Sequence, residues 1–176
     1  MMHSTWIDSP LGQLMLAGDE NGLCGLWMKD QKYFGASLPE GAEERELPVF
    51  AAAKDWLARY FDGQNPCIDF PLTPEGSEFR QSVWKQLLSI PYGSTTSYGQ
   101  IAKKLEALCG RAVSAQAVGG AVGHNPISII IPCHRVLGSN GNLTGYAGGI
   151  ERKIWLLRHE GADPALLRIP TRGTAL

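Results

Sequence analysis

The sequence predicts an α/β N-terminal domain, a small sheet plus one helix, followed by a mostly α domain. Short apolar runs separated by turn residues dominate before residue 48, and apolar residues at helical spacing dominate from 77 to 122. The charge also changes sign, since residues 1–74 carry 5 Lys and Arg against 11 Asp and Glu, and residues 75–161 carry 9 against 5. We therefore predict domains at residues 1–74 and 75–161, and a loose, patternless tail over 162–176.

The N-terminal part has the pattern of a scaffold. Residues 14–17 and 23–27 flank a turn-rich segment and predict a β-hairpin. Apolar residues recur at helical spacing from Pro48 to Phe61, where Pro48 suits a first turn and Gly63 suits the stop. Residues 67–72 predict one more short strand. No catalytic pattern occurs in this part.

Three helical segments follow in quick succession. The first follows a cap at Ser77, and the second opens with Ser97 and Gln100 at the spacing of a capping box. The third, from Ser114 to Val122, is built almost entirely of small residues. Two short helices after a longer one are typical of a helix-turn-helix. An ordinary three-helix bundle would have the same periodicity, so periodicity leaves both open.

The remaining elements alternate strands and turns before a last helix. Residues 127–131 predict a short apolar strand stopped by Pro132. Residues 135–137 and 143–146 flank Asn140-Gly141, a strong hairpin signal. An amphipathic helix is predicted over 150–160, with Gly161 just past its end.

The cysteines and the chain start indicate a reduced environment. The four cysteines are widely separated, without the spacing of a zinc site or of a disulfide framework. We expect Cys24, Cys67 and Cys109 to be small buried hydrophobic residues. No apolar stretch is long enough for a membrane span, and the N-terminus lacks the pattern of a secretory signal. These features predict a cytoplasmic protein with no membrane segment, no metal and no cofactor.

The sharpest chemical feature is Pro132-Cys133-His134-Arg135, directly after a predicted strand. A free thiol has a pKa of about 8.5, so only a small fraction is thiolate at neutral pH, and an imidazole can take its proton. Side chains of adjacent strand residues point oppositely. The pair can cooperate only if Pro132 forces a turn or a water bridges them. The alternative is a buried cysteine beside a surface histidine.

Residues 131–136 resemble the active-site signature of the 6-O-alkylguanine-DNA alkyltransferases, also called methylated-DNA–protein-cysteine methyltransferases. The resemblance covers roughly residues 77–161. It includes five further segments: 79–84, 97–102, 125–126, 144–149 and 153–161. It implies a ribonuclease-H-like N-terminal domain and a winged helix-turn-helix DNA-binding domain.

The resemblance also implies roles for individual residues. Cys133 would accept the alkyl group, His134 would be its base through a water, and Glu160 would orient the imidazole. Asn125 would tie the helix-turn-helix to the active-site turn, and Tyr98 would donate to the flipped guanine. Without the resemblance, Tyr98 is a buried hydroxyl, Glu160 a surface charge and Asn125 a turn former. The walls of the pocket and the nearby DNA surface would include these residues: Gly99, Val136, Ser139, Tyr146, Gly148 and Gly149.

The implied function is direct repair of DNA by a monomer. One alkyl group would move irreversibly from 6-O-alkylguanine in double-stranded DNA to Cys133, and 4-O-alkylthymine remains open as a second substrate. The alternative is an alkyltransferase-like protein that only flags lesions, but such proteins lack the acceptor cysteine. A cysteine hydrolase would need a distant histidine and an oxyanion hole, which the sequence does not signal.

One departure from the family pattern concerns the DNA-binding helix. Gln116 stands where the family carries an arginine that enters the base stack. The segment 105–114 is also about one helical turn longer than usual. On a continuous helix Arg111 would lie about 140° from Gln116 and could not replace it. We predict that base flipping is weaker here, or that Arg111 reaches the DNA along another path. Ala147 likewise removes a hydroxyl contact that some relatives make.

Overall fold

The computed structural model describes residues 1–169, and the chain forms two compact units. Unit 1 comprises residues 1–75 and 126–130, and unit 2 comprises 76–125 and the residues from 131 onward. A short segment from the second half of the sequence thus belongs to the N-terminal unit. None of the helices within residues 1–169 combines the length and the apolar character needed to cross a bilayer.

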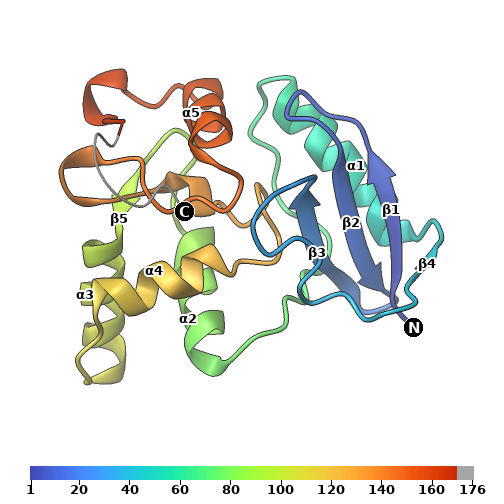
Figure 1. The fold of residues 1–176 in the computed structure, drawn as a ribbon, viewed down its shortest axis with the longest axis horizontal. Coiled ribbons are helices and arrows are strands. Elements are labelled where there is room, and N and C mark those ends of the chain that lie inside the picture. The colour runs from blue at the N-terminus through green and yellow to red at the C-terminus, as the bar shows by residue number, and fades with distance from the viewer. Residues whose placement is uncertain (170–176) are drawn as a thin grey trace. The chain divides into compact units, whose positions relative to one another are not determined.

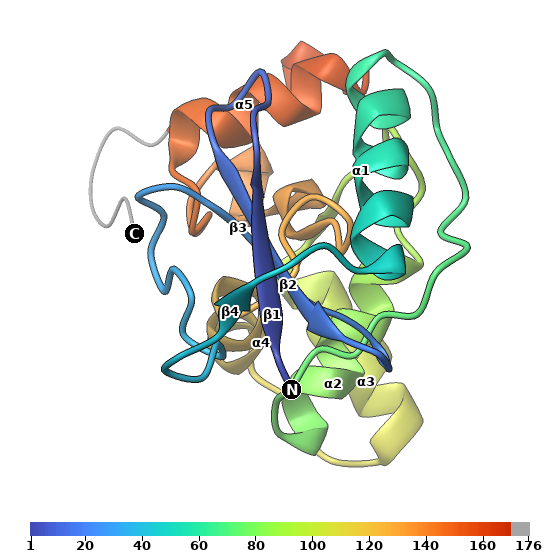
Figure 2. The same ribbon diagram turned by 90° about the vertical axis from the view of Figure 1, so that its right-hand side faces the viewer.

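Unit 1 is a small sheet with one helix beside it, as Figures 1 and 2 show. Three antiparallel strands, and a short fourth strand parallel to the first, have the order β3-β2-β1-β4. Their bounds are β1 His3–Ile7, β2 Leu14–Asp19, β3 Gly22–Met28 and β4 Glu43–Glu44. The predicted β2–β3 hairpin is confirmed, whereas β1 and β4 were not predicted.

Helix α1 (Pro48–Phe61) covers the sheet as its periodicity predicted. Pro48 occupies the first turn, where its missing N–H costs nothing. The face toward β2 and β3 is buried: Phe50, Ala53, Trp56, Leu57 and Tyr60. The Trp56 and Tyr60 rings stack with centroids 5.3 Å apart.

Unit 2 is mainly helical, with α2 (Glu78–Leu88), α3 (Tyr98–Cys109), α4 (Ala115–Gly123) and α5 (Ile150–His159). The two N-caps that the sequence predicted, at Ser77 and Ser97, are present, and Ser114 is a third that was not predicted. Ser77 Oγ accepts from Arg80 N, Ser114 Oγ accepts from Ala117 N, and Ser97 and Gln100 form a complete capping box. Helices α2, α3 and α4 pack against one another. This arrangement is compatible with the predicted helix-turn-helix.

Two of the predicted strands are wrong. Residues 127–131 form one bridge, Leu26 with Ile127, and then turn at Ile129, whose φ is +70°. The run is fully buried, and burial alone produced its strand-like composition. Residues 67–72 make only the single bridge between Leu23 and Leu72.

The predicted hairpin over residues 135–146 is also wrong. Strand β6 (Val136–Leu137) pairs in parallel with β5 (Thr96–Ser97), some forty residues earlier. The Asn140-Gly141 signal still makes a tight turn, since both residues have positive φ within the 3-10 helix Ser139–Gly141. The turn chemistry was local and predictable, whereas the strand's partner was not.

The end of the chain and two cysteines also differ from expectation. Within residues 162–169, Pro164–Leu166 forms a 3-10 helix and Arg168 bridges Asn142, so this part is not a loose tail. The rest of the predicted tail, residues 170–176, lies outside the described residues. Cys24 is buried as expected, but Cys67 and Cys109 are exposed because neither lies in a covered strand or on a buried helix face.

Candidate active site

The chain makes a tight turn at Pro132-Cys133-His134-Arg135. Residues Cys133–Arg135 form one 3-10 turn, with Cys133 N donating to Ile131 O at 2.8 Å and Arg135 N donating to Pro132 O at 3.1 Å. The opposite orientation of neighbouring strand side chains therefore does not apply to Cys133 and His134. The turn that their cooperation requires is present, and all three of its residues are buried.

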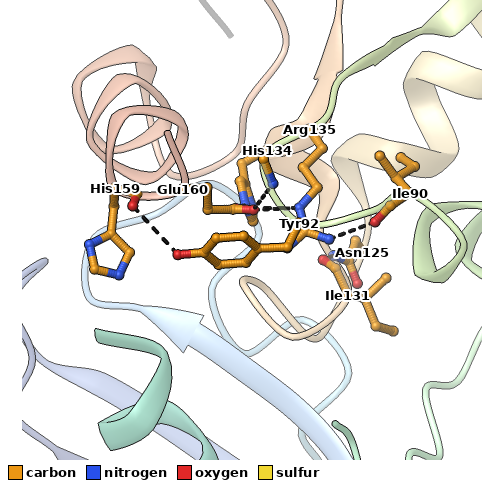
Figure 3. Close-up of polar contacts among 9 residues, drawn as sticks. Ile90, Tyr92, Asn125, Ile131, His134, Arg135, His159 and Glu160 are labelled. Atoms are coloured by element: carbon orange, nitrogen blue, oxygen red, sulfur yellow. Dashed lines mark hydrogen bonds and ion pairs between the residues drawn. The ribbon is translucent and has the colours of Figure 1, made fainter. Parts of the chain in front are cut away.

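Glu160 is the centre of a buried polar network (Figure 3). His134 Nε2 donates to Glu160 Oε2 at 2.5 Å, and Arg135 Nε donates to Glu160 Oε1 at 2.6 Å. Burial alone would raise the pKa of Glu160, but these two hydrogen bonds and the nearby positive charge lower it to about 2. Glu160 is therefore a carboxylate at neutral pH, and it is the C-cap of α5 rather than a surface charge.

The carboxylate fixes the tautomer of His134. Because an ionised carboxylate can only accept, Nε2 carries the proton and Nδ1 keeps its lone pair. Nδ1 is buried and has no hydrogen-bond partner among residues 1–169. Burial lowers the pKa of His134, and the Glu160 carboxylate only partly opposes this effect. At neutral pH His134 is therefore an uncharged imidazole with one free basic nitrogen.

Cys133 is 4% exposed, and its surroundings act on the thiol in opposite directions. Burial raises the pKa of Cys133, while a hydrogen bond from Asn125 and the positive charge of Lys153 act to lower it. Asn125, just after α4, also donates from Nδ2 to Ile131 O at 2.9 Å. One amide thus joins the end of α4 to the active turn and stabilises negative charge on the sulfur.

Tyr98 opens helix α3 and faces the loop after β6. Its hydroxyl donates to Thr144 O at 3.0 Å. Burial raises the pKa of Tyr98, and negative charge on Cys133 adds to this, so the phenol keeps its proton. A Cβ on Gly145 would lie 2.5 Å from the hydroxyl oxygen, and Gly145 has a φ of +85°. Only glycine permits this approach.

Two cations of the site were not assigned a role from the sequence. Lys153 lies on the buried face of α5, and its ammonium donates to Val136 O at 2.5 Å and to Thr144 O at 3.1 Å. Burial lowers the pKa of Lys153 to about 8. Arg135 donates from Nη1 to Ile90 O at 2.7 Å (Figure 3), which anchors the active turn to the end of α2. The sequence did contain a signal for Lys153, because it is a lysine within the apolar stripe of a predicted helix.

The other predicted residues lie around this centre or on its flanks. Val136 is in β6, Ser139 is exposed in the following turn, and Tyr146 is buried. Gly148 and Gly149 lead into α5, and Gly99 lies in the first turn of α3. The network therefore combines Cys133, His134, Glu160, Asn125 and Tyr98, with the remaining residues beside it.

Gln116 and Arg111 do not lie on one continuous helix. Gln116 is exposed in the first turn of α4, whereas Arg111 belongs to the loop before it. Arg111 borders an open groove between α2, α3 and this loop, and Gln116 does not line that groove. The helical angle derived from the sequence therefore does not apply to Arg111.

The arrangement is suited to one nucleophilic attack by sulfur. It holds a thiol, a neutral imidazole with an available lone pair, a carboxylate behind the imidazole, and a phenol that retains its proton. Over residues 1–169, no three His, Cys, Asp or Glu side chains gather closely enough to hold a metal ion.

Comparison with known proteins places both parts of the chain. Residues 2–74 match the model of the 6-O-methylguanine DNA methyltransferase, ribonuclease-like domain, and residues 78–162 match that of the DNA binding domain of the same family. A methylated-DNA–protein-cysteine methyltransferase of Methanosarcina acetivorans is 45% identical over 162 residues, which is 92% of this chain and 99% of that protein. One of Mycobacterium bovis is 47% identical over 91% of this chain and 93% of its own length.

Solved structures agree with these matches. The crystal structure of Mycobacterium tuberculosis OGT in complex with DNA superimposes with a TM-score of 0.79 at 45% identity, covering 93% of this chain and 97% of that one. The M. tuberculosis O6-methylguanine methyltransferase gives 0.78 at 46% identity, covering 94% and 96%. The predicted fold class is thereby confirmed, and the chain belongs to the 6-O-methylguanine DNA methyltransferase family.

Proposed function

We propose that this chain repairs DNA by direct reversal, moving an alkyl group from the 6-oxygen of guanine to Sγ of Cys133. The observation that carries this proposal is the single buried turn that holds Cys133 beside His134, whose ring Glu160 fixes in one tautomer. The family match and the DNA-bound mycobacterial relative support DNA as the partner.

The first step is removal of the thiol proton. His134 Nδ1 accepts it through one water, and the new imidazolium is stabilised by the Glu160 carboxylate at Nε2. Asn125 and Lys153 stabilise the thiolate that results. These two groups offset part of the cost of a charged sulfur in a buried site.

The second step breaks the bond between the alkyl carbon and the guanine oxygen. Sγ attacks the carbon in line, a sulfur–carbon bond forms, and the bonding electrons pass to the base. Tyr98 then turns its hydroxyl proton from Thr144 O toward the leaving guanine, whose growing negative charge it stabilises. The guanine anion then takes a proton from water and the His134 imidazolium returns its proton to water, so that in the net reaction the thiol proton is transferred to guanine and the alkyl group to sulfur.

Two properties follow for the substrate and the protein. The 6-oxygen lies inside a base-paired duplex, so the nucleotide must rotate out of the stack, at a cost of a few kcal/mol.

The product is a thioether, which no group near Cys133 can cleave, so each molecule acts once. Every residue of the network comes from one chain, and we propose that the chain acts as a monomer.

The direct test is the mass of the intact protein after incubation with a duplex that holds a single 6-O-methylguanine. We expect a gain of one methylene group, located in the peptide that contains Cys133. A lesion-flagging protein would bind the same duplex and gain nothing.

Two variants make this test specific. Cys133→Ala should leave the lesion in place, whereas Cys109→Ala should transfer like the parent because Cys109 is an exposed thiol outside the network. The proposal fails if Cys133→Ala clears the lesion at the parental rate, or if the lesion disappears while the parent protein stays unmodified.

A further inference from the structure

The C-terminal segment returns to the turn beside the active site. Leu143 N donates to Arg168 O and Arg168 N donates to Gly141 O, both at 2.8 Å. These bonds form a parallel bridge between Asn142 and Arg168. The segment lies beyond residue 162, where the family match ends. The match to the DNA binding domain therefore assigns it no role.

Side-chain packing fits the segment to the turn. Leu167 packs on a buried cluster: Leu137, Leu143, Leu157 and Ala162. Gly141 has a φ of +77°, and a Cβ there would lie 1.8 Å from Leu166 O. The backbone at Leu166 can approach the turn this closely only because residue 141 is glycine.

This docking places Arg168 in a groove of about 630 Å³. The facing wall is rich in hydroxyl and amide groups: Thr95, Thr96, Ser97, Gln100 and Ser139. No acidic residue lines the groove. Over residues 1–169, no carboxylate lies within ion-pair distance of the Arg168 guanidinium, which is therefore an uncompensated charge among hydrogen-bonding side chains.

The surface that carries these hydroxyl and amide groups continues away from Arg168, along α3. Thr95, Thr96 and Gln100 also border a neighbouring depression, which ends at Lys103 and Lys104 and again contains no acidic residue. A strip of hydroxyl groups therefore has cations at both ends. Guanidinium, ammonium and hydroxyl groups together bind phosphate oxygens without regard to base sequence.

The strip begins next to the reacting groups. Thr96 and Ser97 pair with Val136 and Leu137, and Tyr98 follows directly. The Tyr98 hydroxyl in turn contacts Thr144, two residues after the Asn142 bridge. A nucleotide held between Tyr98 and Cys133 would thus have its strand pass close to this strip.

We propose that residues 164–168 are part of the DNA-binding surface and that Arg168 binds a backbone phosphate beside the lesion. This inference rests on the proposed function, because it takes DNA as the partner. The docked segment contributes the cation, and the Thr95–Gln100 side supplies the hydroxyl groups.

The test compares Arg168→Gln with Arg158→Gln, since each removes one exposed positive charge from unit 2 and Arg158 lies on α5 away from the groove. Binding of an unmodified duplex is measured over a range of salt concentrations. One phosphate contact contributes about 0.9 to the slope of log affinity against log salt. We expect Arg168→Gln to lose about that amount and to bind several-fold more weakly at low salt, and Arg158→Gln to keep the parental slope.

A second arm tests whether docking places the charge. Gly141→Ala should push Leu166 away, weaken binding in the same way, and leave little further effect for Arg168→Gln in that background. The inference is wrong if Arg168→Gln keeps the parental slope, or if the two effects simply add. A parent protein that neither binds duplex nor gains the methyl group would instead refute the proposed function.

Discussion

Replacing Glu160 by glutamine tests the central claim about the site, because it keeps the shape and removes the charge. The carboxylate accepts from both His134 and Arg135. A glutamine oxygen that keeps the bond to Arg135 leaves its NH₂ group facing His134 Nε2. The imidazole must then carry its proton on Nδ1, and it can no longer take a proton from Cys133.

We expect this variant to lose both transfer rate and stability. Loss of a general base lowers a rate by about 10²- to 10⁴-fold. We expect a loss of this size in the rate of single-turnover methyl transfer by Glu160→Gln near neutral pH. The displacement of the Glu160 pKa from 4.5 to about 2 sets an upper limit of about 3 kcal/mol on its contribution to stability, because part of the displacement comes from a charge that His134 carries only when protonated. Glu160 is 6% exposed, so solvent screens this contribution little.

The sign of the pH dependence follows from the lowered pKa. A carboxyl group with a lower pKa in the folded state stabilises the fold fully above its unfolded pKa and loses this effect as the pH falls toward 2. The difference in unfolding free energy between parent and Glu160→Gln should therefore be largest above about pH 5 and shrink below it.

The assays are rapid-quench transfer of a radiolabelled methyl group and denaturant unfolding. Glu46→Gln is the matched control, since Glu46 forms an exposed ion pair with Lys54 at 2.6 Å. Exposed pairs contribute about 0–1 kcal/mol, and Glu46 lies in unit 1, so transfer should stay parental. Transfer by Glu160→Gln within threefold of the parent from pH 6 to 9 would refute the tautomer argument.

Two further predictions concern a buried cation and the DNA-binding helix. The Lys153 pKa of about 8 lies below its ordinary 10.5, so the folded state gains stability relative to the unfolded state as the pH rises between these values. The stability of the parent relative to Lys153→Met, measured by denaturant unfolding, should rise by about 3 kcal/mol over that window, and a flat difference would contradict the burial of a charged ammonium. Gln116→Arg should raise duplex affinity and speed repair, measured by anisotropy and lesion loss; no change in either would show that Gln116 does not limit flipping.

The parts of the fold that the sequence predicted correctly are those with local signals. Ser77 and Ser97 each cap a helix as predicted, and such a cap depends on residues within one turn. The errors concern partners far along the chain. Nothing near Val136 indicates that it pairs with Thr96, and nothing in residues 127–131 indicates that they bridge β3 instead of forming a strand.

The site shows the same division. The motif at Cys133-His134 was visible because the two residues are adjacent, whereas Glu160 entered only through resemblance to a family. Lys153 was missed because a lysine in an amphipathic helix is ordinarily on the solvated face. Its ammonium instead satisfies two carbonyl oxygens, Val136 and Thr144, which only the folded loop brings together.

The burial of Cys133 bears on the proposed function, in which each molecule uses its nucleophile once. A low thiol pKa would make a faster nucleophile, but also one open to oxidants and to stray alkylating agents. Burial instead raises the Cys133 pKa and lowers that of His134, so the resting pair is a neutral thiol and a neutral imidazole. Under the proposed function, the charged pair becomes favourable only when the thiolate can attack a bound alkyl carbon and the leaving guanine can receive a proton. Glu160 keeps its charge and would stabilise the imidazolium at that moment, so we expect reactivity to be confined to the complex with damaged DNA.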